Sequence, residues 1–194
     1  MQNTLAAPAH SELVVRKSRF IGCVEPVDGR AAALVRVSAL RSAHPGAAHV
    51  CWALMAGGNS AANDDGEPGG TAGRPMLEVL RHHRLGGVLA TAVRYFGGIK
   101  LGAGGLVRAY TDTVAQALLG ATAVPLVHRV TMQCAVPYAL EGVVRRELAQ
   151  AGAAAIAVQH RSLVHFSFDL AQPEMAPCAA RLDDACQGRV AWGS

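Results

Sequence analysis

Three acidic side chains stand within four residues of one another in the segment NDDGEPGGTAGRPM, which covers residues 63–76. Asp64, Asp65 and Glu67 are carboxylates, the ligands that Mg²⁺ takes together with the phosphate oxygens of a substrate. The same acids have a structural interpretation, because an acid beside a helix start caps the helix and an acid in a loop pairs with arginine. The sequence leaves both interpretations open.

A glycine-rich segment follows, RYFGGIKLGAGGLVRAY, which covers residues 94–110. Backbone N–H groups that glycine leaves accessible at a helix N-terminus bind phosphate and other anions. Lys100 and Arg108 would add positive charge to such a site. With the acids, this segment allows a phosphate- or nucleotide-using enzyme, either a phosphotransferase or a hydrolase.

Several features weigh against catalysis. The glycines do not follow the GxxxxGK[ST] pattern of a phosphate-binding loop. Thr71 is the only hydroxyl side chain between Asp64 and Pro75, so the acidic loop offers no serine nucleophile. A metal-dependent dipeptidase would need a richer set of histidine and carboxylate ligands. We assign no catalytic residue, metal or cofactor, and whether the protein is an enzyme stays open.

The same residues suit a binding surface. Arginine and lysine side chains contact phosphates, and aromatic side chains stack on unpaired bases or on a protein partner. In this interpretation the acids shape the surface by capping a helix or by pairing with Arg74 or Arg94. The glycine-rich segment offers Tyr95, Phe96 and Tyr110 for such stacking, but for Phe96 and Tyr110 we expect a position in the core instead. The candidate binding residues are Asp64, Asp65, Glu67, Thr71, Arg74, Arg94, Tyr95, Lys100 and Arg108.

The positive charge of the chain is concentrated around this segment. The formal net charge is +4 at pH 7, and residues 72–110 hold six lysines and arginines against the single acid Glu78. Such an excess attracts polyanions such as RNA. A solvated basic face would give the same count, so charge alone permits a ribosome or RNA partner without requiring one.

Composition predicts a folded protein of the cytoplasm. The chain is 51% hydrophobic and 16% charged, which is typical of globular domains. It contains no uncharged apolar run of about 18 residues, and its first residues lack the pattern of a signal peptide. The five cysteines include no CxxC pair, so neither a disulfide framework nor a zinc site is expected. Nothing in the sequence indicates the oligomeric state.

Hydrophobic periodicity predicts an α+β fold with two domains, residues 1–123 and 126–194, separated near Pro125. For the first domain we expect one or two strands in residues 12–27, a helix over 30–43 and a buried strand over 48–57. A loop over 59–73 is followed by a helix that begins near Pro75. A central strand over 88–96 and a helix after the glycine-rich turn complete this domain.

The second domain has the pattern of a ferredoxin-like fold. A strand over residues 126–136 is followed by a helix over 137–151 and by two strands, 154–160 and 162–170. A second helix over 173–186 and a last strand over 188–193 complete the order β-α-β-β-α-β.

Four long motifs carry a family resemblance: KSRFIG, HPGAAHVCWA, DDGEPGGTAG and AVRYFGGIKLGAGGLVRAYTD. They closely resemble the signature of the IMPACT family, whose bacterial members are the YigZ-type proteins. The resemblance covers roughly residues 15–120, and it extends to the remaining residues through the domain arrangement only. Gly69 is a departure, because family members usually have serine there. The strand over 88–96 also lacks an asparagine that the family tends to have.

The resemblance implies both a fold and a function. It implies a left-handed β-α-β N-terminal domain, like the fourth domain of elongation factor G and the GHMP kinases, followed by a ferredoxin-like domain similar to the factor's fifth. Eukaryotic relatives regulate translation by binding a ribosome-associated activator of the general-control kinase. We therefore expect a translation-associated regulatory or binding protein that contacts the ribosome, RNA or a ribosome-bound partner.

Overall fold

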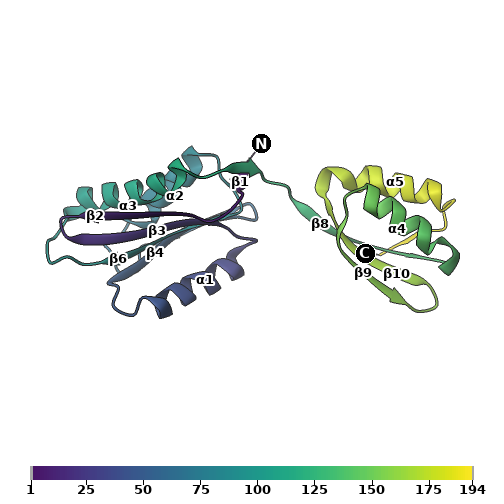
Figure 1. The fold of residues 1–194 in the computed structure, drawn as a ribbon, viewed down its shortest axis with the longest axis horizontal. Coiled ribbons are helices and arrows are strands. Elements are labelled where there is room, and N and C mark those ends of the chain that lie inside the picture. Colours follow the sequence, from purple (N-terminus) through teal and green to yellow (C-terminus); the bar gives the residue numbers. More distant parts are fainter. Residues whose placement is uncertain (1, 194) are drawn as a thin grey trace. The chain divides into compact units, whose positions relative to one another are not determined.

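The computed structural model describes residues 2–193, and the chain forms two compact units, one ending at Leu126 and the other beginning at Val127. Both units combine helices with antiparallel sheets (Figure 1). The predicted α+β, two-domain fold is confirmed. Within residues 2–193, no helix is long and apolar enough to cross a membrane.

The first unit is built on a five-stranded sheet in the order β2-β3-β6-β4-β5. Every neighbouring pair is antiparallel. Strands β3 and β4 therefore run parallel to each other on either side of β6, and α1 connects them as the β-α-β unit that the family resemblance implies. The strands are β2 (Ala9–Val15), β3 (Ser18–Pro26), β4 (His49–Ala56), β5 (Asn59–Asn63) and β6 (Val88–Tyr95), and the connecting helix is α1 (Arg30–Ala43).

Helices cover both faces of this sheet (Figure 1). Helices α2 (Gly73–His82) and α3 (Gly102–Leu119) pack on one face through a core that includes Phe20, Met76 and Tyr110. Helix α1 packs on the other face, against residues such as Trp52. Strand β6 lies between the two cores and is buried along most of its length, which confirms its predicted central position. A separate two-stranded sheet joins β1 (Asn3–Leu5) to β7 (Ala123–Pro125).

Two predictions for this unit are wrong. The sequence predicts a loop for residues 59–63, but they form the edge strand β5, which pairs with β4. Gly57 and Gly58 both have positive φ and make the tight turn between the two strands. Backbone hydrogen bonds to β4 therefore form the strand, although its side chains show no apolar periodicity. The sequence also predicts a core position for Phe96, but 53% of it is exposed, because β6 ends at Tyr95 and the chain leaves the sheet there.

The second unit is ferredoxin-like, as predicted. Its sheet has the order β11-β8-β10-β9, and all neighbours are antiparallel. Alternate residues of β10 are buried against the two helices, including Phe166 and Phe168. The elements are β8 (Arg129–Val136), η1 (Tyr138–Leu140), α4 (Glu141–Gln150), β9 (Ala154–His160), β10 (Val164–Ala171), η2 (Gln172–Glu174), α5 (Met175–Ala185) and β11 (Ala191–Trp192).

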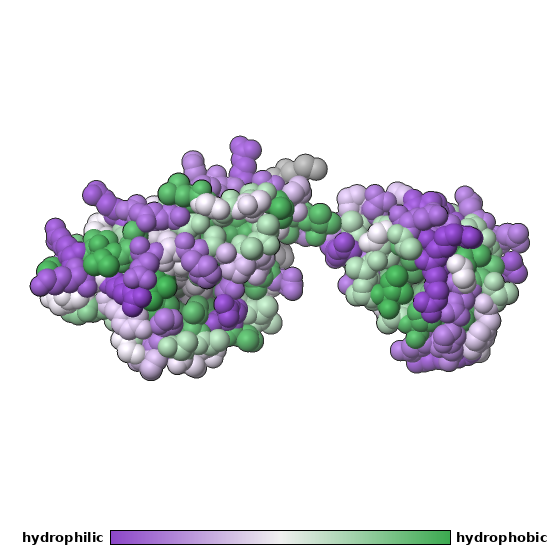
Figure 2. Space-filling view, viewed as in Figure 1, coloured by the Kyte–Doolittle hydropathy of each residue, from purple (hydrophilic) through white to green (hydrophobic). Residues whose placement is uncertain are grey.

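The surface of both units mixes hydrophilic and hydrophobic residues on the face that Figure 2 shows. Several large apolar side chains are exposed, among them Phe96, Ile99 and Leu119 in the first unit. Exposed apolar residues that occur singly are ordinary in folded proteins, whereas adjacent ones point to an interaction surface.

Candidate functional site

Glu67 is the centre of a buried polar network in the first unit. Its side chain is 3% exposed, and its Oε1 atom accepts a hydrogen bond of 2.6 Å from Arg94 and one of 2.7 Å from the Tyr110 hydroxyl. The other oxygen lies 3.8 Å from Nε2 of His49. A buried carboxylate requires such partners, because removing its charge from water costs several kcal/mol of free energy.

Arg94 is the cationic partner and is itself buried. Its second terminal nitrogen lies 3.3 Å from Oγ of Ser18, and its guanidinium carbon lies 5.5 Å from the ring centre of Phe20 and 5.6 Å from that of Phe96. Its Nε has no hydrogen-bond partner within residues 2–193. Of the two roles predicted for Arg94, the structure shows the internal ion pair, with Glu67 as the partner.

Asp64 organises the start of α2. One carboxylate oxygen accepts hydrogen bonds from the backbone N–H groups of Ala72 and Gly73, and the other accepts one from Gly70. Burial of the carboxylate opposes ionisation, but the three hydrogen bonds outweigh it and lower the pKa of Asp64. This is the capping role that the sequence left open, because the N–H groups of Ala72 and Gly73 at the helix start have no partner within the helix.

Asp65 fastens the acidic loop to the sheet. Its carboxylate accepts a hydrogen bond of 2.6 Å from the backbone N–H of Val50 in β4 and pairs with Arg41 of α1. Its backbone carbonyl accepts a hydrogen bond of 2.7 Å from Nδ1 of His49. Asp65 has a φ of 45°, a conformation that aspartate tolerates better than most residues.

All three acids of the loop therefore have partners inside the protein. Across the part of the chain that the structure describes, no three His, Cys, Asp or Glu side chains are grouped so that they could hold a metal ion. Burial also raises the pKa of the Cys51 thiol to about 12, so the thiol stays protonated near neutral pH and is a poor nucleophile. The contacts of the three acids therefore stabilise the conformation of the loop itself.

Two more of the candidate residues have internal partners. Thr71 is buried, and its hydroxyl donates a hydrogen bond of 2.6 Å to the carbonyl of Pro68. Tyr95 is half-buried, and its hydroxyl is hydrogen-bonded to Nδ1 of His44 at 2.8 Å. Both side chains stabilise the loops around the site.

The other three candidates, Arg74, Lys100 and Arg108, are exposed. None of them forms an ion pair with an acid in residues 2–193. Arg74 lies in the first turn of α2, Lys100 lies just before α3, and Arg108 lies in the second turn of α3. The first turn of α3 contains no acid and has no side-chain cap, so its backbone N–H groups add positive potential.

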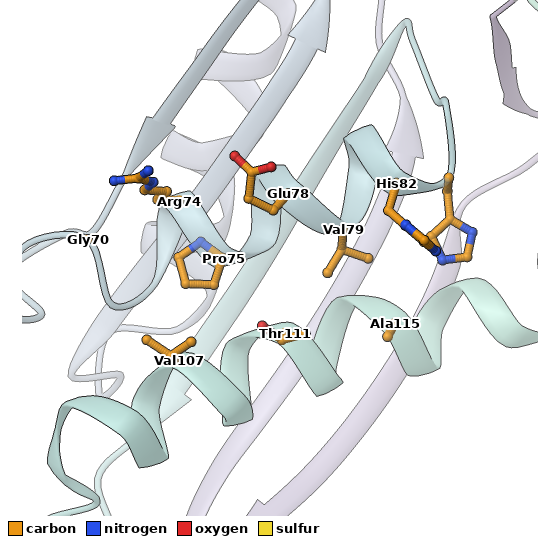
Figure 3. A pocket seen from close by; sticks show the side chains of 10 residues that line it. Gly70, Arg74, Pro75, Glu78, Val79, His82, Val107, Thr111 and Ala115 are labelled. Carbon is orange, nitrogen blue, oxygen red and sulfur yellow. The ribbon is translucent and has the colours of Figure 1, made fainter.

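Helices α2 and α3 run side by side in the same direction. Pro75 lies opposite Val107, and His82 lies opposite Ala115, along a groove of about 710 Å³ between them (Figure 3). Both helix N-termini therefore lie at the same end of the unit. The Glu67–Arg94 ion pair joins the acidic loop before α2 to the first residue of the glycine-rich segment before α3.

Comparison with known proteins identifies the family. Residues 16–118 match the family model of the Impact N-terminal domain, and residues 134–189 match a domain family of unknown function, DUF1949. The chain belongs to the IMPACT family. It is 38% identical to the IMPACT family member YigZ of Escherichia coli, over 95% of this chain and 93% of that protein.

Other relatives match over a shorter length. The IMPACT family member YvyE of Bacillus subtilis is 47% identical, over 59% of this chain and 54% of the relative. A family member of Haemophilus influenzae is also 47% identical, over 54% of this chain and 53% of the relative. The chain thus spans about half the length of these two relatives.

Solved structures support the fold. A crystal structure of a hypothetical protein has a TM-score of 0.79 and 34% identity, and it covers 99% of this chain and 97% of its own. The two-domain translational regulator Yih1 matches with a TM-score of only 0.33 and 22% identity, and this weak match establishes nothing about the present chain.

Sequence reasoning anticipated Arg94 as a partner of the acids, but it missed the burial of Glu67 and the other members of the network. Glu67 lies between a glycine and a proline in a polar segment, where an acid is normally exposed. Ser18 reaches the network through Arg94, and Cys51 of β4 reaches it through Tyr110 and through the backbone carbonyl of Asp64. Only the folded sheet brings these residues together, so no local pattern could have indicated them.

Proposed function

We propose that this IMPACT family member is a translation-associated protein that binds RNA, on the ribosome or free, through its first unit. The observation that carries the proposal is the division of the candidate residues into two groups. The acids of the loop are engaged by partners within the protein, whereas Arg74, Lys100 and Arg108 are exposed and form no ion pair with an acid in residues 2–193.

The arrangement of these cations supports a polyanion as the ligand. They lie around the N-terminal ends of two parallel helices, and the uncapped N-terminus of α3 adds positive potential beside Lys100. The carboxylates that a magnesium-dependent phosphotransferase would need already accept hydrogen bonds from the protein. The geometry therefore favours contact with phosphate groups over chemistry on them.

Co-sedimentation with ribosomes and with purified RNA across a salt series tests the proposal. For Lys100→Ala we expect weaker association and a salt dependence whose slope falls by roughly one unit, because one phosphate contact is lost. Arg74→Ala and Arg108→Ala are expected to behave in the same way.

Arg30→Ala is the matched control. Arg30 is exposed and has no ion pair among residues 2–193, but it begins α1 on the opposite face of the sheet. Its replacement should leave affinity and salt slope unchanged. The proposal fails if Lys100→Ala, Arg74→Ala and Arg108→Ala all bind with the affinity and slope of the unaltered protein.

A further inference from the structure

Phe96 is an exposed aromatic residue that follows the last residue of β6. About half of it, 53%, is accessible to solvent, although phenylalanine is usually buried. The guanidinium of Arg94 lies over the ring, with its central carbon 5.6 Å from the ring centre. The ring is therefore supported by a cation on one side and still offers a large open surface.

The support under Phe96 is rigid. Arg94 is buried, donates a hydrogen bond of 2.6 Å to Glu67 and packs on another side against the ring of Phe20. A cation–π contact to such a fixed group restricts the rotamers of Phe96. An aromatic side chain that is already ordered loses less conformational entropy when a ligand binds to it.

The chain just after Phe96 is also held in place. The N–H of Gly97 donates a hydrogen bond of 3.2 Å to Oγ of Ser18. A Cβ atom at Gly97 would lie only 2.0 Å from the carbonyl carbon of Lys17, so the segment packs directly on the turn between β2 and β3. Arg16 and Lys17 form that turn, both with positive φ.

The surface next to Phe96 is consequently basic and partly apolar. Arg16, Lys17 and Lys100 are exposed, and Ile99 is 41% exposed. Neither residues 13–19 nor residues 94–105 include an acid. Beneath this surface, the carboxylate of Glu67 is paired with Arg94.

A flat aromatic ring among cations is how proteins hold single-stranded nucleic acid. Bases stack on the ring while lysines contact the neighbouring phosphates. The internal bases of a duplex cannot use such a ring, because they are stacked on one another and present only their edges. The surface around Phe96 thus fits an unpaired base better than a helical RNA.

We propose that Phe96 is a stacking platform for an unpaired base of single-stranded RNA, with Lys17 and Lys100 contacting the flanking phosphates. This inference rests on the proposed RNA-binding function and specifies the form of RNA and the residue that receives the base.

Binding of the full chain to short single-stranded RNA and to a duplex of equal length tests the inference. A 2-aminopurine base in the single strand reports stacking by its loss of fluorescence. Phe96→Leu, which keeps an apolar side chain, should weaken single-strand binding roughly 5- to 150-fold, because stacking on one ring contributes about 1–3 kcal/mol. Phe96→Tyr should restore affinity and quenching, and duplex binding should stay unchanged in both variants.

Tyr138→Leu in the second unit is the matched control, because Tyr138 is also aromatic and 53% exposed. Thermal unfolding of each variant checks that the fold is intact. If Phe96→Leu keeps single-strand affinity while Lys100→Ala lowers the salt slope, stacking is refuted and RNA binding stands. Equal losses for single strand and duplex would also refute stacking. If the unaltered protein binds neither RNA, the proposed function fails together with this inference.

Discussion

At the scale of single residues, burial separates structural from ligand-binding candidates. Glu67 and Arg94 have the residue types of a phosphate or metal site, yet each is at most 6% exposed in its side chain. Lys100 has the same charge as Arg94 and lies six residues later, but it is exposed at a turn. Residue type and spacing pointed to all three, but they did not separate the side chains that face inward from those that face solvent.

The first prediction at this scale concerns the Glu67–Arg94 pair. Glu67→Gln leaves an unneutralised arginine in the core, so we expect the free energy of unfolding to fall by about 3–5 kcal/mol. Denaturant unfolding measures this loss. In the double variant Glu67→Gln/Arg94→Met the buried charge is gone, and part of the loss should be recovered.

The exposed pair Glu12–Arg19 is the control for that experiment. Its atoms approach to 2.8 Å, but both side chains are about half exposed, so solvent screens their interaction. Glu12→Gln should change stability much less than Glu67→Gln. Equal effects of the two substitutions would contradict the role assigned to the buried pair.

At the scale of elements, most helices and strands were predictable and the connections between them were not. Helix α1 spans the predicted residues, because its apolar side chains recur at helical spacing and HPG follows its end. Strand β5 was missed because NSAAN has neither apolar alternation nor β-branched residues. The partners of Asp64 could not be predicted for a similar reason, since three N–H groups converge on it only once the loop folds back.

The cap at the start of α2 gives the second prediction. Asp64→Asn should reduce the free energy of unfolding at pH 7 by about 1–2 kcal/mol, because the amide has no charge and only one acceptor oxygen, which leaves a backbone N–H group without its partner. The native pKa of Asp64 is lowered, so its stabilisation is present above the unfolded pKa and disappears as pH falls through the native one. The gap between variant and unaltered protein should therefore shrink in acid, below the ordinary aspartate value of 3.8.

Urea unfolding of both proteins across a pH series measures that gap. Asp112→Asn is the control, because Asp112 lies exposed on α3 and accepts no side-chain hydrogen bond within the described residues. A constant difference between Asp64→Asn and the unaltered protein down to strongly acidic pH would show that the carboxylate charge does not stabilise the loop.

At the scale of the whole molecule, each unit has its own core and its own sheets. The second unit encloses Phe166, Phe168, Leu148 and Leu182 in a cluster formed only by its own residues. In the first unit β1 pairs with β7, so the first and the last strand of this unit are hydrogen-bonded to each other. Independent cores of this kind are typical of domains that fold alone.

The third prediction follows from this independence. Residues 127–194 expressed alone should fold to a cooperative α+β domain, with circular dichroism and amide dispersion like those of the same residues in the full chain. Because so short a domain buries a smaller share of its surface, it should be less stable than residues 1–126. The full chain should then unfold in two steps, of which the earlier matches the isolated second domain. A fragment 127–194 that stays unfolded, while the full chain unfolds in one transition, would mean that the second domain depends on the first for its stability.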